Sequence, residues 1–267
     1  MSILSGFLYP PPPSAFLTAM TAISGVALAY FGLSEAWGKH LQYSKFWNAG
    51  SPPSDKQLRI SSRVGMLLLY TPALVAAAAA FAFPAVVADD RCRLLALALA
   101  LHFFKRDFEV CVVFIHQYSG NMILDSAIPI SLSYFSGTVC MIYAQYLTQG
   151  EPGPRVDLKV AGEVLFLVGI TGNFYHHHLL SKLREKGDKT YKIPKGGLFG
   201  LVICPHYLFE IIVFIGFCLI SQTLYSFFFA LGTLWYLMGR SYATRRWYLS
   251  KFDNFPKEVK ALIPFIF

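Results

Sequence analysis

Polar residues that could do chemistry lie inside strongly apolar sequence in the last third of the chain. Helical spacing puts Asn173, His177, Leu180 and Arg184 on one face, in steps of four, three and four residues. Such residues are costly in membrane-type sequence, so we treat them as functional candidates. Arginine suits a phosphate-bearing ligand, because a guanidinium group donates paired hydrogen bonds and stays charged when it is desolvated.

Two later segments repeat this pattern. His206 and Glu210 stand four residues apart, and Arg240 and Tyr248 stand eight apart, so each pair shares one helix face. A purely structural interpretation stays open for each pair: a histidine bonded within a helical bundle, or an arginine whose head reaches the membrane surface.

An earlier apolar segment carries a fourth polar face, with His102, Arg106 and Glu109 on one side and Lys105 four residues before Glu109. An internal salt bridge that holds helices together is the alternative interpretation here. Taken together, these segments predict a polar pocket in a helical bundle, open at one membrane surface. The residues assigned to it are Arg106, Asn173, Arg184, Tyr191, His206, Glu210, Arg240 and Tyr248.

The run His176–His178 invites a metal-site interpretation. Consecutive residues on a helix point about 100° apart and do not converge on one ion. We therefore predict no metal site.

Composition indicates the elements that must position these residues. Hydrophobic residues make up 55% of the chain and charged residues only 14%, against about 25% charged in soluble domains. The five cysteines show no paired spacing. The net charge of +8 comes from bases that flank apolar segments, which indicates membrane orientation and not nucleic-acid binding.

We therefore predict an all-α membrane protein with about seven transmembrane helices. Apolar runs of roughly 20 residues, the length that crosses a bilayer, occur at about 15–37, 63–87, 92–115, 122–147, 158–181, 198–220 and 222–246. The third run is interrupted by charged residues and fits two shorter pieces as well. The first run is expected to be a retained span. A signal peptide requires a positively charged segment before its apolar run, and here no Lys or Arg precedes Lys39.

Basic residues fix the expected orientation. They concentrate in the first connection, in the connection at 182–197 and in the C-terminal tail. The positive-inside rule then places the N-terminus in the lumen and the C-terminus in the cytosol.

Specific motifs resemble the steroid 5α-reductase (3-oxo-5-alpha-steroid 4-dehydrogenase) family. They are YKIPKGGLF at 191–199, CPHYLFE at 204–210, the tail at 248–267, and the Asn173 helix with Leu183-Arg184. The resemblance implies a C-terminal domain at 122–267 on the NADPH side and helices at 1–121 on the substrate side.

The resemblance further implies a multi-pass enzyme of the endoplasmic reticulum membrane that uses NADPH to reduce a carbon–carbon double bond conjugated to a carbonyl. Hydride reaches the β-carbon while a hydrogen-bond donor polarises the carbonyl. The candidate donors in this chain are Tyr70 and Tyr248. The implied cofactor-binding residues are Arg106, Asn173, His177, Arg184, Tyr191, His206, Glu210, Arg240 and Tyr248.

The chain also departs from this family. Steroid reductases carry a Gln-Glu pair and a Tyr that grip the 3-keto group, whereas this chain has Leu69-Tyr70 and Phe103. Its third span instead resembles very-long-chain trans-2-enoyl-CoA reductases, through His102–Arg106, Glu109, His116 and Ser119.

Several functions therefore stay open at this point. The first is reduction of a 3-oxo-Δ4-steroid or a similar lipid, and the second is reduction of an enoyl thioester. A membrane methyltransferase that uses S-adenosylmethionine and a non-catalytic lipid-binding relative are the others. The expected partners are the membrane and a hydrophobic lipid or steroid, without nucleic acid, and the sequence indicates no oligomeric state.

Overall fold

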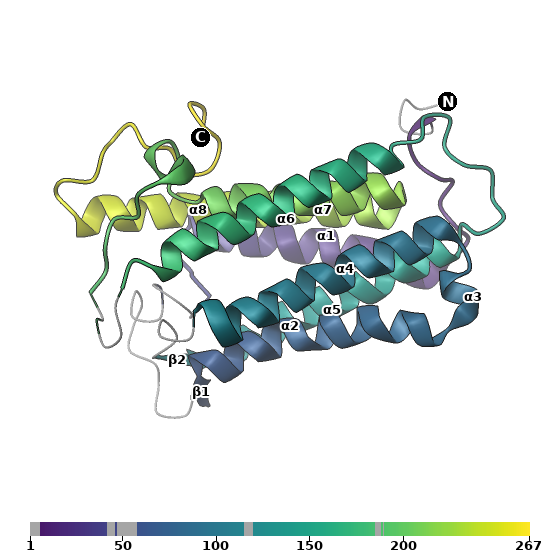
Figure 1. Ribbon diagram of the computed structural model, residues 1–267, viewed down its shortest axis with the longest axis horizontal. Coiled ribbons are helices and arrows are strands. Elements are labelled where there is room, and N and C mark those ends of the chain that lie inside the picture. Colours follow the sequence, from purple (N-terminus) through teal and green to yellow (C-terminus); the bar gives the residue numbers. More distant parts are fainter. Residues whose placement is uncertain (1–5, 42–45, 47–57, 115–119, 185–187, 189) are drawn as a thin grey trace.

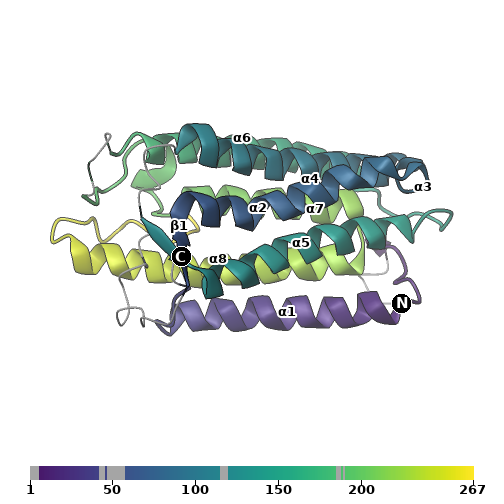
Figure 2. The same ribbon diagram turned by 90° about the horizontal axis from the view of Figure 1, so that it is seen from below.

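The computed structural model describes residues 6–41, 46, 58–114, 120–184, 188 and 190–267. It is a bundle of long helices in which helices consecutive along the chain run in opposite directions (Figures 1 and 2). In chain order, these helices are α1 (Ala15–Ala36), α2 (Ser62–Ala79), α4 (Asp90–Phe108), α5 (Leu124–Tyr146), α6 (Lys159–Ser181), α7 (Pro205–Ser221) and α8 (Leu224–Lys251).

Short elements connect them. They are the strands β1 (Arg59–Ser61) and β2 (Asn121–Ile123), the helix α3 (Pro84–Val87), the 3₁₀ turns η3 (Ala80–Ala82) and η5 (Gly197–Gly200), and the π-helix η4 (Glu109–Val113). The strands pair antiparallel, with Arg59 opposite Ile123, and so hold the starts of α2 and α5 together.

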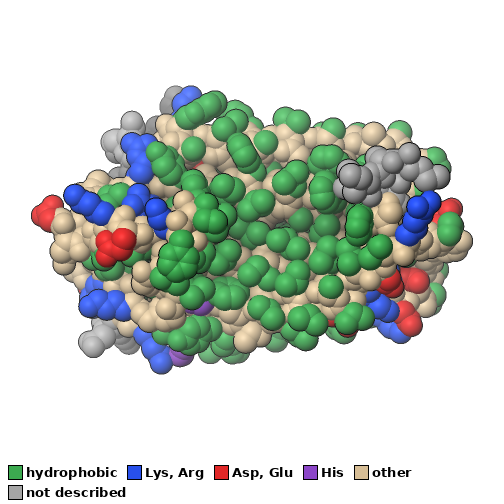
Figure 3. Space-filling view, turned by 90° about the horizontal axis from the view of Figure 1, so that it is seen from above, with side chains coloured by type: hydrophobic (Ala, Val, Ile, Leu, Met, Phe, Trp, Pro, Cys, Tyr) green, Lys and Arg blue, Asp and Glu red, His purple; other side chains and the backbone are tan. Residues whose placement is uncertain are grey.

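The long helices follow the predicted apolar runs closely, so the helical fold is confirmed. Within the residues that the structure describes, three segments are long and apolar enough to cross a membrane: α1, Ser62–Ala82 and α5. Figure 3 shows apolar side chains covering the middle of one face of the bundle, while charged side chains gather at its two ends. The predicted interruption of the third run is the transition at Glu109, where α4 gives way to η4.

Local sequence sets the helix starts. Four prolines precede α1, and the Ser14 hydroxyl caps its first turn by accepting from the Leu17 backbone N–H at 3.3 Å. Asp89 caps α4 in the same way through the Cys92 N–H, at 2.8 Å.

Glycines bring the helices close enough to place the polar side chains. A Cβ on Gly169 of α6 would lie 2.7 Å from the backbone nitrogen of Val213 in α7. A Cβ on Gly239 of α8 would lie 2.1 Å from the carbonyl oxygen of Gly32 in α1. Consequently α6 packs directly on α7, and α1 on α8.

Candidate active site

A buried polar network lies where α4, α6 and α7 converge with α2, at the end of the bundle opposite the start of α1 (Figure 1). All of its members are buried except Arg106, whose side chain is 13% exposed. They are Tyr70, His102, Lys105, Arg106, Glu109, Asn173, His177 and Glu210.

Glu109 is the anionic centre of this network. Its carboxylate lies 3.1 Å from Lys105 Nζ, 2.6 Å from Arg106 Nη1 and 2.9 Å from His177 Nδ1. Three partners compensate the desolvation of this carboxylate, which is 1% exposed. The internal salt bridge expected between Lys105 and Glu109 is therefore present, and it extends across helices to α6.

Arg106 connects this anion to the predicted carbonyl donor. Its Nη1 lies 2.8 Å from His177 Nδ1, and its Nη2 donates to the Tyr70 hydroxyl oxygen at 2.5 Å. Tyr70 is 4% exposed, on the buried face of α2. The structure thus unites Tyr70, Arg106 and His177, which are far apart in sequence.

Asn173 joins three helices. Its Nδ2 donates to the His206 carbonyl oxygen at 2.7 Å and to Glu210 Oε2 at 3.0 Å, while its Oδ1 accepts from Lys105 Nζ. The other oxygen of the Glu210 carboxylate, Oε1, lies 3.4 Å from His102 Nε2 on α4. The predicted Asn173 and Glu210 therefore belong to the same network as Arg106.

An aromatic group holds three other predicted residues. The Arg184 guanidinium lies 4.9 Å from the Tyr191 ring centroid, Tyr191 contacts Trp247 at 4.8 Å, and Trp247 contacts Tyr248 at 5.0 Å. Because α6 ends at Ser181, Arg184 does not continue the helical face of Asn173 and His177 as its spacing suggested.

His206 stands between the two groups. Its ring centroid lies 5.4 Å from that of His177 in the network and 4.2 Å from that of Tyr207. Tyr207 packs against the apolar cluster that contains Tyr248.

Arg240 lies on the buried side of α8 and contacts an acidic side chain of α1. This fully buried guanidinium forms an ion pair with Glu35 of α1, with 2.6 Å between Nη1 and Oε1. The neighbouring hydroxyls of Ser241 and Thr244 are 0% exposed and make no hydrogen bond within the described part of the chain. Buried polar atoms without such a bond mark a place for a polar ligand or water.

The Gly196-Gly197 turn is fixed against α6 by a histidine of the triple run. Both glycines have positive φ, at 85° and 52°, and a Cβ on Gly197 would lie 2.6 Å from His176 Nε2. The Leu198 N–H donates to the same nitrogen at 3.1 Å. His176 therefore has a structural role in placing the motif at 191–199.

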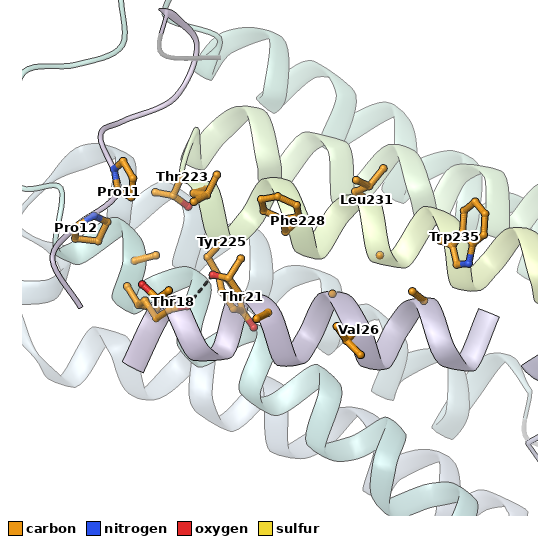
Figure 4. A pocket seen from close by; sticks show the side chains of 17 residues that line it. Pro11, Pro12, Thr18, Thr21, Val26, Thr223, Tyr225, Phe228, Leu231 and Trp235 are labelled. Atoms are coloured by element: carbon orange, nitrogen blue, oxygen red, sulfur yellow. Dashed lines mark hydrogen bonds between the residues drawn. The ribbon is translucent and has the colours of Figure 1, made fainter. Parts of the chain in front are cut away.

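An apolar cavity of about 730 Å³ lies between α1 and α8 near the start of both helices, with Pro11 and Pro12 at one end and Trp235 at the other (Figure 4). None of its lining residues belongs to the polar network. It is thus separate from the place where the proposed donor Tyr70 lies.

Sequence reasoning missed Glu35 and Ser241 as site residues. Glu35 carried a signal, because it is the only charged residue among the first 38. His116 and Ser119, part of the resemblance to enoyl reductases, lie outside the described residues.

Comparison with known proteins identifies the family. A family profile described as 3-oxo-5-alpha-steroid 4-dehydrogenase matches residues 122–267. The chain is 29% identical to 3-oxo-5-alpha-steroid 4-dehydrogenase 2 of Homo sapiens, over 96% of this chain and 97% of that protein. It is 32% identical to 3-oxo-5-alpha-steroid 4-dehydrogenase 1 of Macaca fascicularis, over 79% and 81%.

A shorter match is to steroid 5-alpha-reductase DET2 of Gossypium hirsutum, 46% identical over 40% of this chain and 42% of that protein. The profile covers residues 122–267 of 267, and the 32% identical relative is aligned over 79% of this chain and 81% of its own length. The chain therefore belongs to the 3-oxo-5-alpha-steroid 4-dehydrogenase family, oxidoreductases that act on a CH–CH group with NADP as acceptor.

Proposed function

We propose that the chain is an NADPH-dependent reductase of a carbon–carbon double bond conjugated to a carbonyl, and that its substrate is a 3-oxo-Δ4-steroid. Family membership supports the reaction class. The observation that carries the proposal is the contact between Tyr70 and Arg106, because it links a candidate carbonyl donor to the candidate cofactor residues.

Tyr70 is suited to polarise a carbonyl. Its hydroxyl oxygen accepts from a cation, and this withdraws charge from the phenol and strengthens its O–H as a donor. Because Tyr70 is buried, its hydrogen bond should stabilise the negative charge that develops on the substrate oxygen more strongly than it would in contact with water. This chain lacks the Gln-Glu pair and the Tyr that bind the 3-keto group in steroid reductases. In the proposed mechanism, Tyr70 donates the hydrogen bond to that group instead.

The residues at this end of the bundle fit a dinucleotide. Three arginines offer guanidinium groups, and the buried hydroxyls of Ser241 and Thr244 make no hydrogen bond within the described chain. Bound NADPH would supply the hydride for the β-carbon. The residues that would hold it are Arg106, Asn173, His177, Arg184, Tyr191, His206, Glu210, Arg240 and Tyr248.

The site draws on both proposed parts of the chain. Tyr70 and Arg106 come from residues 1–121, which we assign to the substrate, and Asn173 and Glu210 come from residues 122–267, which we assign to the cofactor. We further propose seven spans in the endoplasmic reticulum membrane, with the polar network at the cytosolic end, because the connection at 182–197 and the C-terminal tail carry the bases there.

The test uses protein purified in detergent. NADPH should raise its thermal unfolding temperature more than NADH does, and S-adenosylmethionine should leave it unchanged. Incubation with NADPH should convert a 4-ene-3-ketosteroid to a product two mass units heavier. Reduction of trans-2-enoyl-CoAs alone would assign the second substrate class, and failure of NADPH to bind would reject the function.

A further inference from the structure

The ion pair between Glu35 and Arg240 closes the contact between the first and last long helices. Both side chains are 1% exposed, and the Glu35 Oε1 to Arg240 Nη1 distance is 2.6 Å. A desolvated guanidinium needs a compensating anion, because removing one member of a buried pair leaves an uncompensated charge. Glu35 supplies that anion.

Glu35 is held by more than Arg240. Its Oε2 lies 2.7 Å from His40 Nδ1, and its Oε1 also accepts the Leu41 backbone N–H at 3.1 Å. If Arg240 turned to another anion, the Glu35 carboxylate would keep these two donors. The pair is therefore built so that the arginine can exchange its partner while the glutamate stays hydrogen-bonded.

Buried hydroxyl groups close to Arg240 in sequence could bind an anionic ligand together with it. It follows the same face of α8 as Thr244 and Tyr248, and the buried hydroxyls of Ser241 and Thr244 lie beside it in sequence without a hydrogen bond in the described chain. The Phe46 ring, 4.2 Å from the guanidinium carbon, covers Arg240 from the connection after α1.

We propose that Glu35 is an exchangeable counter-ion for Arg240. It neutralises Arg240 in the ligand-free protein, competes with a phosphate group of the ligand for the same guanidinium, and so sets the affinity of the site for anions. Glu35 is thus a positioning residue that acts through Arg240. The inference rests on the proposed function, which places Arg240 in the cofactor site.

Glu35→Gln tests this, because the amide keeps the shape of the side chain and removes its charge. Thermal unfolding is measured in detergent free of phospholipid, without ligand and with increasing NADPH or inorganic pyrophosphate. The ligand-free variant should unfold at a lower temperature than the wild type. Its Kd for both anions should be smaller by about fivefold or more, the lower range of coupling between sites. An unchanged or larger Kd in the folded variant would overturn the proposal and leave Glu35 a purely structural residue.

Two further variants keep the test decisive. Glu35→Asp keeps the charge but shortens the side chain, so it should tighten anion binding less than Glu35→Gln does. If Glu35→Gln does not fold, Glu35→Asp replaces it in the test. An unchanged Kd for Glu35→Asp would then contradict the proposal. Glu35→Gln combined with Arg240→Gln should abolish the gain, whereas persistence of the gain would assign the effect to another cation.

Glu151→Gln is the matched control, since it makes the same change at an exposed turn and should leave the Kd unchanged. The two proposals fail in different ways. A gain with pyrophosphate but no binding of NADPH by any variant rejects the proposed function and keeps the counter-ion. If NADPH binds and its Kd is unaffected by Glu35→Gln, the counter-ion proposal is rejected and the proposed function is kept.

Discussion

Arg106 donates a hydrogen bond to the hydroxyl oxygen of Tyr70 at 2.5 Å, and the guanidinium also lies 4.6 Å from the centre of the Tyr70 ring. This contact joins α2 to α4 at the polar end of the bundle. Arg106 in turn contacts Glu109 and His177, so the position of the tyrosine depends on the whole buried network.

Tyr70→Phe should remove the proposed carbonyl donor and leave the network's charges in place. We expect kcat to fall by about 10²- to 10³-fold, the usual effect of losing one such donor. NADPH should still stabilise the variant against thermal unfolding as it does the wild type. Tyr134→Phe is a matched control, because the Tyr134 ring packs against Tyr70 at 5.7 Å. Unaltered turnover in Tyr70→Phe would exclude Tyr70 from the mechanism.

Arg184→Ala should lower the preference for NADPH over NADH. Arg184 lies beyond the end of α6 and packs on Tyr191, where its charge is suited to the extra phosphate of NADPH. The difference between the thermal shifts produced by NADPH and NADH measures the effect. Arg246→Ala, which removes a guanidinium that packs on Tyr242 in the last turns of α8, is the control. An undiminished difference would place the cofactor's distinguishing phosphate elsewhere.

The helices and part of the site were predictable because they depend on local sequence. Apolar runs long enough to cross a bilayer define the long helices, and residues three or four apart define faces, as the Lys105 pair with Glu109 shows. Contacts between helices were not predictable in this way. Glu35 and Arg240 are 205 residues apart, and helical spacing carries no information on which helix packs against which.

The prediction that Arg184 shares a helix face with Asn173 and His177 was wrong. The spacing of Asn173, His177 and Arg184 assumes an unbroken helix, but α6 ends at Ser181 and the chain turns before Arg184. The Gly196-Gly197 turn then brings the following segment back onto His176. Such a reversal depends on tertiary contacts and not on the periodicity of the helix.

Glu109→Gln should destabilise the protein, because it removes the anion shared by Lys105, Arg106 and His177. Breaking a buried ion pair from one side costs about 3–5 kcal/mol. The free energy of unfolding in mixed detergent micelles measures the loss. Glu151→Gln, an exposed carboxylate in a turn, should change it by less than about 0.5 kcal/mol. Equal effects of the two variants would contradict the role of Glu109 as the centre of the network.

Gly169→Ala should separate α6 from α7. The added Cβ would lie 2.7 Å from the Val213 nitrogen and 2.8 Å from its Cγ2, so backbone must move, at a cost of about 1–3 kcal/mol. Gly25→Ala is the matched control: its Cβ meets nothing within 4 Å at the wall of the apolar cavity, and alanine favours the helix by roughly 0.5–1 kcal/mol. The free energy of unfolding should therefore fall for Gly169→Ala and hold or rise for Gly25→Ala. The opposite order would contradict the close packing of α6 on α7.

Asp157→Asn should change how stability depends on pH at the opposite end of the bundle. The Lys159 backbone N–H and then the Arg91 guanidinium, 2.6 Å away, hold the pKa of the Asp157 carboxyl below its ordinary value. A carboxyl whose pKa is lowered by folding stabilises the protein above its unfolded pKa of about 3.9, and this contribution disappears as the pH falls through the folded pKa. Because Asp157 is 61% exposed, the contribution should stay below about 1 kcal/mol. The difference in unfolding free energy between wild type and Asp157→Asn should accordingly be constant above pH 5 or so and shrink towards pH 3. A difference that grows as the pH is lowered would contradict the stabilising role of this carboxylate.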